Sequence, residues 1–82
     1  MIQIKFFARL RDQLGQADLQ LPYDNLKEVA DVQAALIKLQ PQWQDILSGA
    51  NILVAVNQTL CHKHSAVKDG DEVAFFPPVT GG

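Results

Sequence analysis

Hydrophobic and polar residues alternate in the first segment of the chain. Ile2, Ile4 and Phe6 fall on one side of an extended backbone, and the residues between them fall on the other. This period of two predicts a β-strand over 2–7 with one buried face. Residues 17–21 alternate in the same way, and the connection between the two segments is short. Two such neighbours most simply pair as an antiparallel hairpin.

A period of three to four residues follows and predicts the main helix, over 29–40. Its apolar stripe consists of Val29, Val32, Leu36 and Leu39. Asp24 or Asn25 is the expected N-cap, with Glu28 in the first turn, where the helix dipole favours a carboxylate. Pro41 disfavours helical geometry at the residue before it, so the helix should end at this point.

Two shorter helical segments flank these elements. Residues 8–14 permit one helical turn, which Gly15 then ends. Trp43, Ile46 and Leu47 form an apolar cluster, which we interpret as a turn or short helix lying over the core.

Three extended segments complete the chain. Residues 52–56 are apolar at every position, as expected for a strand that is buried on both faces. Residues 60–64 are interpreted as a short edge strand, and residues 72–76 as the last strand. This order predicts an α+β fold, in which one helix packs across one mixed sheet of four to five strands. The first and last strands are expected to pair in parallel at its centre.

Composition restricts the partners and the compartment. The 82 residues suffice for a single domain, 1–82, with 48% hydrophobic and 20% charged residues. The net charge is −2 without clusters of Lys and Arg, which argues against nucleic acid as a partner. No apolar run has the length of a membrane helix, and the N-terminus lacks the pattern of a secretory leader. Cys61 is the only cysteine, so we expect a cytoplasmic protein without a disulfide.

The C-terminal segment 77–82 carries the main chemical hypothesis. Pro77 and Pro78 have a fixed φ and no N–H donor, so the segment should project as an extended tail. Gly81 and Gly82 lack side chains around the terminal carboxylate and can approach another surface closely. The alternative is a frayed end, where small residues are common.

Three apolar residues are candidates for a partner surface. If the first and last strands are neighbours, Phe7 and Phe76 lie on the face away from the helix, and Leu60 can join them. Loops that cover these side chains are the alternative, and for Phe7 the alternative is a core contact on the second face. Arg11 is either solvated or forms a salt bridge with a partner.

The residues give no indication of a catalytic or metal site. Cys61, His62 and His64 are close in sequence, but zinc usually takes three or four protein ligands and no fourth candidate stands out. We interpret them as solvated side chains at a sheet edge. Paired carboxylates, a glycine-rich phosphate loop and a Ser/His/Asp set are absent from the sequence. The chain is therefore not expected to bind a cofactor or to break bonds alone.

The chain resembles a known family over essentially its whole length, and the resemblance is strongest in three stretches. They read FFARLRDQLG over 6–15, AVNQTL over 55–60 and DGDEVAFFPPVTGG over 69–82. The chain resembles the small, sulfur-carrying subunit of molybdopterin synthase, a ubiquitin-like β-grasp protein. The proline pair that leads into Val-Thr-Gly-Gly distinguishes this family from other β-grasp proteins.

The resemblance implies a function for the tail. An E1-like adenylyltransferase would use ATP to activate the carboxylate of Gly82, and sulfur from a persulfide would convert it to a thiocarboxylate. The narrow tail, with Thr80 and Gly81, would then enter the large subunit of the synthase, in a heterotetramer. There the sulfur would pass to cyclic pyranopterin monophosphate, a precursor of the molybdenum cofactor.

The resemblance also assigns the partner surface and leaves two alternatives. Phe7, Leu60 and Phe76 match the family's hydrophobic interface, and Arg11 matches an arginine of its first loop. A protein modifier would instead join Gly82 to lysines of target proteins. A passive interaction module would have an incidental Gly-Gly end.

Overall fold

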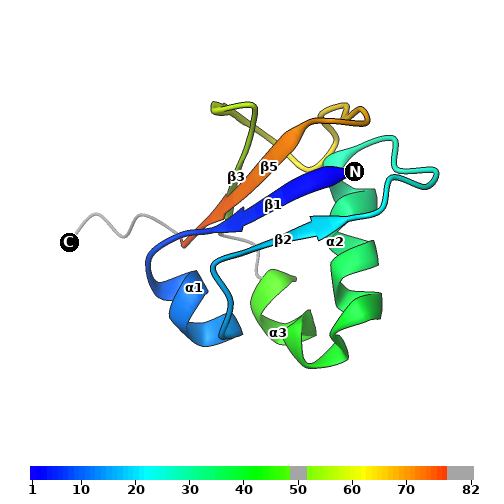
Figure 1. The fold of residues 1–82 in the computed structure, drawn as a ribbon. Helices are drawn as coiled ribbons and strands as arrows, with labels where there is room; N and C mark the ends of the chain where they lie inside the picture. The colour runs from blue at the N-terminus through cyan, green and yellow to red at the C-terminus, as the bar shows by residue number, and fades with distance from the viewer. Residues whose placement is uncertain (49–51, 78–82) are drawn as a thin grey trace.

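The alternating segments of the sequence form a sheet, and the segment with the longer period lies across one of its faces as a helix (Figure 1). The computed structural model describes residues 1–48 and 52–77. Its elements are, in chain order, β1 (Ile2–Phe6), α1 (Arg9–Leu14), β2 (Asp18–Leu21), α2 (Val29–Leu39), η1 (Pro41–Trp43), α3 (Gln44–Leu47), β3 (Leu53–Val56), β4 (Thr59–Cys61) and β5 (Glu72–Phe76).

The five described strands form one mixed sheet in the order β2-β1-β5-β3-β4. β1 and β5 run parallel, with Ile4 opposite Val73, whereas the other three pairs are antiparallel. The predicted hairpin and the predicted central parallel pair are therefore confirmed. β4 lies at an edge, as expected, but it begins one residue earlier than the segment 60–64 and ends at Cys61.

The core lies between the sheet and the helices. The inward side chains of β1 and β5 meet the stripe of α2, and the fully buried members include Ile2, Ile4, Val73, Phe75, Val29, Val32 and Leu36. Trp43 packs edge-on against Phe6, with ring centroids 5.4 Å apart, and Leu47 is buried beside it in the same cluster. The apolar cluster predicted over the core is thus confirmed as η1 and α3.

The start of α2 differs from the expectation that Asp24 or Asn25 caps it. Glu28 is the N-cap, and its side chain forms a capping box with Asp31. Glu28 is extended and bridges to Ala66, which aligns the first turn of α2 with the loop before β5. The backbone N–H groups of Val29 and Ala30 donate to carbonyl oxygens of that loop at 3.0 and 2.7 Å. The helix therefore begins where a distant loop supplies acceptors for its N–H groups.

Two burial expectations are wrong. Leu39 is 55% exposed, because it is the last residue of α2 and Trp43 fills the core at this end. The segment 52–56 is not buried on both faces, since Leu53 is 37% exposed on the outer face of β3. No helix covers that outer face in the described part of the chain. None of the helices within residues 1–48 and 52–77 has the length and apolarity needed to cross a bilayer.

Candidate functional site

The face of the sheet that points away from α2 carries the candidate partner residues. Alternation along β5 directs Phe75 into the core and directs Ala74 and Phe76 to this outer face. Ala55 of β3 lies opposite Ala74, and Leu60 of β4 lies opposite Ala55. Cross-strand partners share a face, so the register brings these four outer residues together.

Phe7 and Phe76 form a stacked pair at one end of this face. Their ring centroids are 4.9 Å apart and their planes differ by 7°. The backbone N–H of Phe7 donates to the carbonyl oxygen of Phe75 at 3.1 Å, which continues the parallel pairing beyond β1. Phe7 is 40% exposed and Phe76 is half-buried. Phe7 therefore contacts the second face of the sheet and still presents surface to solvent.

A sharp turn directly after Phe7 fixes where its ring lies. Ala8 has φ 53° and ψ −130°, and the N–H of Leu10 donates to the carbonyl oxygen of Phe7 at 3.2 Å. This geometry is a type II′ turn, in which glycine usually occupies the position of Ala8. An alanine in such a conformation costs about 1–3 kcal/mol, which the surrounding contacts must offset. The turn leads into α1, which is longer than the single predicted turn and ends at Gly15 with φ 74°.

Leu60 is held in place by the turn between β3 and β4. Asn57 and Gln58 both have positive φ, 51° and 70°, as a two-residue type I′ hairpin requires. The Asn57 amide donates to Oδ1 of Asp71 at 3.0 Å, and its Oδ1 accepts from the N–H of Glu72 at 3.0 Å. Asp71 is buried just before β5. One side chain thus fastens the hairpin that carries Leu60 to the central strand.

Replacement of Asn57 by alanine should lower the free energy of unfolding by about 1–3 kcal/mol, because the buried carboxylate of Asp71 loses a donor. Asn25→Ala is the matched control, since Asn25 also has positive φ, 57°, but is exposed. Urea unfolding of both variants separates the loss of the Asn57 hydrogen bonds from the effect of replacing an asparagine at positive φ. An equal loss in both would mean that only the backbone conformation matters and that the Asn57 amide contributes nothing.

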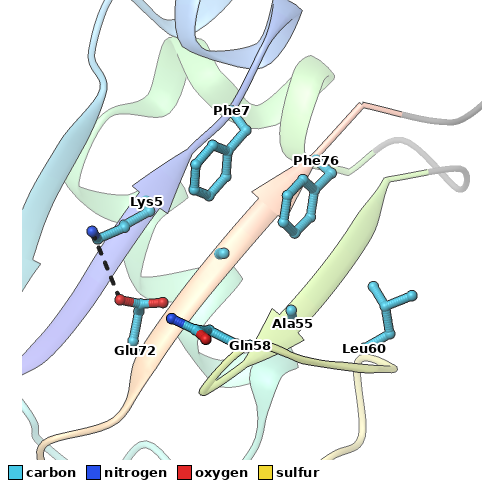
Figure 2. A pocket seen from close by; sticks show the side chains of 8 residues that line it. Lys5, Phe7, Ala55, Gln58, Leu60, Glu72 and Phe76 are labelled. Atoms are coloured by element: carbon cyan, nitrogen blue, oxygen red, sulfur yellow. Dashed lines mark ion pairs between the residues drawn. The ribbon is translucent and has the colours of Figure 1, made fainter.

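These elements border an open hollow of about 360 Å³ on the outer face (Figure 2). We call it the outer hollow. It is lined by Lys5, Phe7, Ala55, Gln58, Leu60, Glu72, Ala74 and Phe76. Figure 2 shows the two phenylalanine rings together at one end and Lys5 with Glu72 at the other. The Lys5 ammonium lies 3.8 Å from a carboxylate oxygen of Glu72. Leu60 is 68% exposed on the rim.

Comparisons with known proteins show the family of the chain and agree with its fold. The sequence pattern of the ThiS family matches residues 4–82. The chain belongs to the ThiS family. It is 44% identical to a Haemophilus influenzae protein named molybdopterin synthase sulfur carrier subunit, over 100% of both chains. An Escherichia coli protein of the same name is 39% identical, again over 100% of both chains.

Among solved structures, the fold is similar to that of SAMP1, a small archaeal modifier protein from Haloferax volcanii. The TM-score is 0.83 at 30% identity, covering 99% of this chain and 98% of that chain. The predicted fold is thereby confirmed: this ThiS-family chain is a ubiquitin-like β-grasp protein with a mixed five-stranded sheet and one main helix across it.

The predicted sulfur-attachment residue, Gly82, lies outside the described residues, as do Thr80 and Gly81. The last described residue is Pro77, which is half-buried and follows β5 directly. Phe76, which immediately precedes it, lines the outer hollow. In this ThiS-family chain Pro77 therefore directly follows a residue at the apolar end of the hollow.

Arg11 is exposed in α1, and its Nε lies 4.0 Å from Oδ1 of Asp12. It does not belong to the lining of the outer hollow among the described residues. The structure therefore brings Phe7, Leu60 and Phe76 together in the outer hollow but does not place Arg11 in its lining. A surface pair of this length contributes little to stability.

The Cys61, His62 and His64 segment has local contacts. Nδ1 of His62 accepts from the backbone N–H of His64 at 3.1 Å, and Nδ1 of His64 lies 3.0 Å from Oε1 of Glu28. The Cys61 thiol lies 3.7 Å from the carbonyl oxygen of Val54. Within residues 1–48 and 52–77, no group of three or more His, Cys, Asp or Glu side chains is placed to hold a metal ion.

Sequence reasoning did not single out five of the residues that line the hollow. They are Lys5, Ala55, Gln58, Glu72 and Ala74. The alternation of the strands places Lys5 and Glu72 on the outer face, and that signal was present in the sequence. Ala55 and Gln58 depend on the turn type and register between β3 and β4, which the sequence does not specify as clearly.

Proposed function

We propose that this chain is the sulfur-carrier subunit of a molybdopterin synthase. The observation that carries the proposal is the full-length similarity to a protein of that name, at 44% identity. The chain ends in the Gly-Gly sequence that such a carrier needs, and its sheet has an apolar hollow beside the point where the tail begins.

The chemistry would take place at the carboxylate of Gly82. A free carboxylate is a poor acyl donor, so an E1-like adenylyltransferase would transfer AMP from ATP to it and release pyrophosphate. The terminal sulfur of a donor's persulfide would displace AMP, and a thiol would reduce the resulting acyl disulfide to the thiocarboxylate. Sulfur attached in this way requires no cysteine in the carrier, which is consistent with the partly buried position of Cys61.

The outer hollow would dock the partner that uses the thiocarboxylate. A large subunit of the synthase would cover Phe7, Leu60 and Phe76 while residues 77–82 reach its active site. Aromatic residues are typical of the centres of protein interfaces, and two of them stack here. The sulfur would then pass to cyclic pyranopterin monophosphate, in a heterotetramer of two small and two large subunits, and the carboxylate of Gly82 would be regenerated.

Intact mass measurement tests the carrier function directly. The chain is incubated with ATP, the activating enzyme and the persulfide donor of the same organism. A carrier gains one sulfur in place of one oxygen, which adds about 16 Da. An unchanged mass, with an activating enzyme that is active on a known carrier, would reject the proposal.

A protein modifier is the second candidate, because the fold neighbour at 30% identity is named as one. The same incubation, supplemented with cell extract, distinguishes the two functions. Target proteins with this chain joined to a lysine through an amide bond favour the modifier. A thiocarboxylate without such adducts favours the carrier.

A further inference from the structure

The floor of the outer hollow consists of two alanines. Ala74 of β5 and Ala55 of β3 lie directly opposite each other, and both are nearly buried by the larger side chains around them. The Phe7–Phe76 stack closes one end of the hollow, and Leu60 borders the floor on the β4 side. A hollow therefore exists at this place because two adjacent positions on the outer face carry only a methyl group.

We propose that this hollow is a socket for one bulky, uncharged apolar side chain of the large subunit, seated over Ala74 and Ala55. The inference rests on the proposed function, because it names the chemistry by which the partner is recognised. The stacked rings contact the inserted side chain from the apolar end of the hollow, and Leu60 contacts it from the β4 side. Ala55 and Ala74 then determine specificity through their small size.

The charges around the hollow favour an uncharged guest. Lys5 and Glu72 already form a pair at 3.8 Å, so the polar end carries no net charge to attract an ion. Gln58 is the remaining polar residue of the lining, and it offers an amide to backbone or side-chain groups that flank the guest. A charged side chain buried against the two rings would lose its hydration without a partner.

The shape of the hollow favours a protein partner over a small molecule. Small-molecule sites enclose most of the ligand's surface, whereas this hollow lies on the open face of a sheet. Leu60, at 68% exposure, stands on the rim, where a partner's surface can cover it but a small ligand inside the hollow cannot. The hollow is also continuous with the phenylalanine pair beside Pro77, so a partner seated here also lies beside the start of the tail.

The first test fills the socket from this side. Ala74→Val and Ala55→Val each add two methyl groups to the floor, and valine is a favourable residue in a strand. Each should raise the Kd for the purified large subunit of the same organism by about 10- to 200-fold, measured by isothermal titration calorimetry. Ala34→Val adds the same atoms on the exposed side of α2 and should leave the Kd within about twofold. The unfolding temperature of each variant shows whether it is folded. If Ala74→Val does not fold, Ala55→Val alone tests the effect on binding.

The second test identifies the inserted side chain. Apolar surface residues of the large subunit are replaced by alanine one at a time and titrated with wild-type chain and with Ala74→Val. A single socket predicts one partner position at which the two substitutions are strongly non-additive, because the smaller side chain makes room for the added methyl groups. Additive effects at every position would overturn the socket, as would wild-type affinity of both filled variants.

The two hypotheses fail in different ways. If the wild-type chain gains sulfur and binds the large subunit, but folded Ala74→Val and Ala55→Val bind equally well, the socket is wrong and the carrier function stands. If the wild-type chain neither gains sulfur nor binds the large subunit, the proposed function is wrong and the socket falls with it.

Discussion

Deletion of Gly82 should reduce sulfur transfer to the precursor by at least about 100-fold. The shortened chain still ends in a glycine carboxylate, that of Gly81, but its reach is about 3.5 Å shorter. A displacement of about 1 Å in an active site already costs about 100-fold in rate. Thiocarboxylate formation is followed by intact mass, and transfer is followed by the appearance of molybdopterin.

Gly82→Ala is the matched control for length. It keeps the full length of the tail and adds one methyl group beside the reacting carbon. It therefore separates the effect of tail length on transfer from the effect of a bulkier terminal residue. The unfolding temperature of the deletion variant should equal that of the wild type, since the buried core of the described chain ends at Phe75. Wild-type transfer by the chain that ends at Gly81 would show that the terminal residue is not the site.

Phe76→Asp should raise the Kd for the large subunit by about 30- to 1,000-fold, which corresponds to about 2–4 kcal/mol of binding free energy. The substitution removes one ring of the Phe7–Phe76 stack and places a carboxylate at the apolar end of the outer hollow. The free energy of unfolding should fall by less than the binding free energy does. Phe76 is only half-buried, and an aromatic pair contributes about 0.5–1.5 kcal/mol beyond its burial. Calorimetric titration and thermal unfolding measure the two effects.

Tyr23→Asp provides the comparison for an aromatic residue outside the hollow. Tyr23 is 40% exposed and does not line the outer hollow, so this variant places the same carboxylate in place of an aromatic residue on a different surface. Its affinity for the large subunit should stay within about twofold of the wild type. If Phe76→Asp instead destabilised the chain by about 3–5 kcal/mol, as truncation of a core phenylalanine does, Phe76 would belong to the core and not to a docking surface.

Most of the fold was predictable because the hydrophobic pattern is consistent with it. The alternation of Ile2, Ile4 and Phe6 specified β1, and Pro41 correctly marked the end of α2. The start of α2 at Val29 was predicted correctly, but its N-cap was not, because Glu28 takes that position and the first helical N–H groups find their acceptors in the loop that contains Ser65. A contact between residues so far apart in sequence leaves no local signal at the helix itself.

The site was predictable where it depends on strand alternation. Phe7 and Phe76 could be placed on one face from the parity of their positions, and the structure stacks them. The floor made by Ala55 was not predictable, because it requires the exact pairing of β3 with β5. The Asn57 amide, which fastens the hairpin to Asp71, was likewise outside the reach of a pattern argument.

The parallel pairing of β1 with β5 also has a consequence for how the chain folds during synthesis. β1 is made before the other described strands and can form its hairpin with β2 early, but its other edge stays open until β5, the last described strand, has been translated. Closing such a long loop is entropically costly, which slows folding relative to local contacts. A nascent chain interrupted before Phe76 cannot complete the central pair and exposes a sheet edge to proteases and to aggregation. The order of the strands thus makes completion of the sheet depend on the translation of β5.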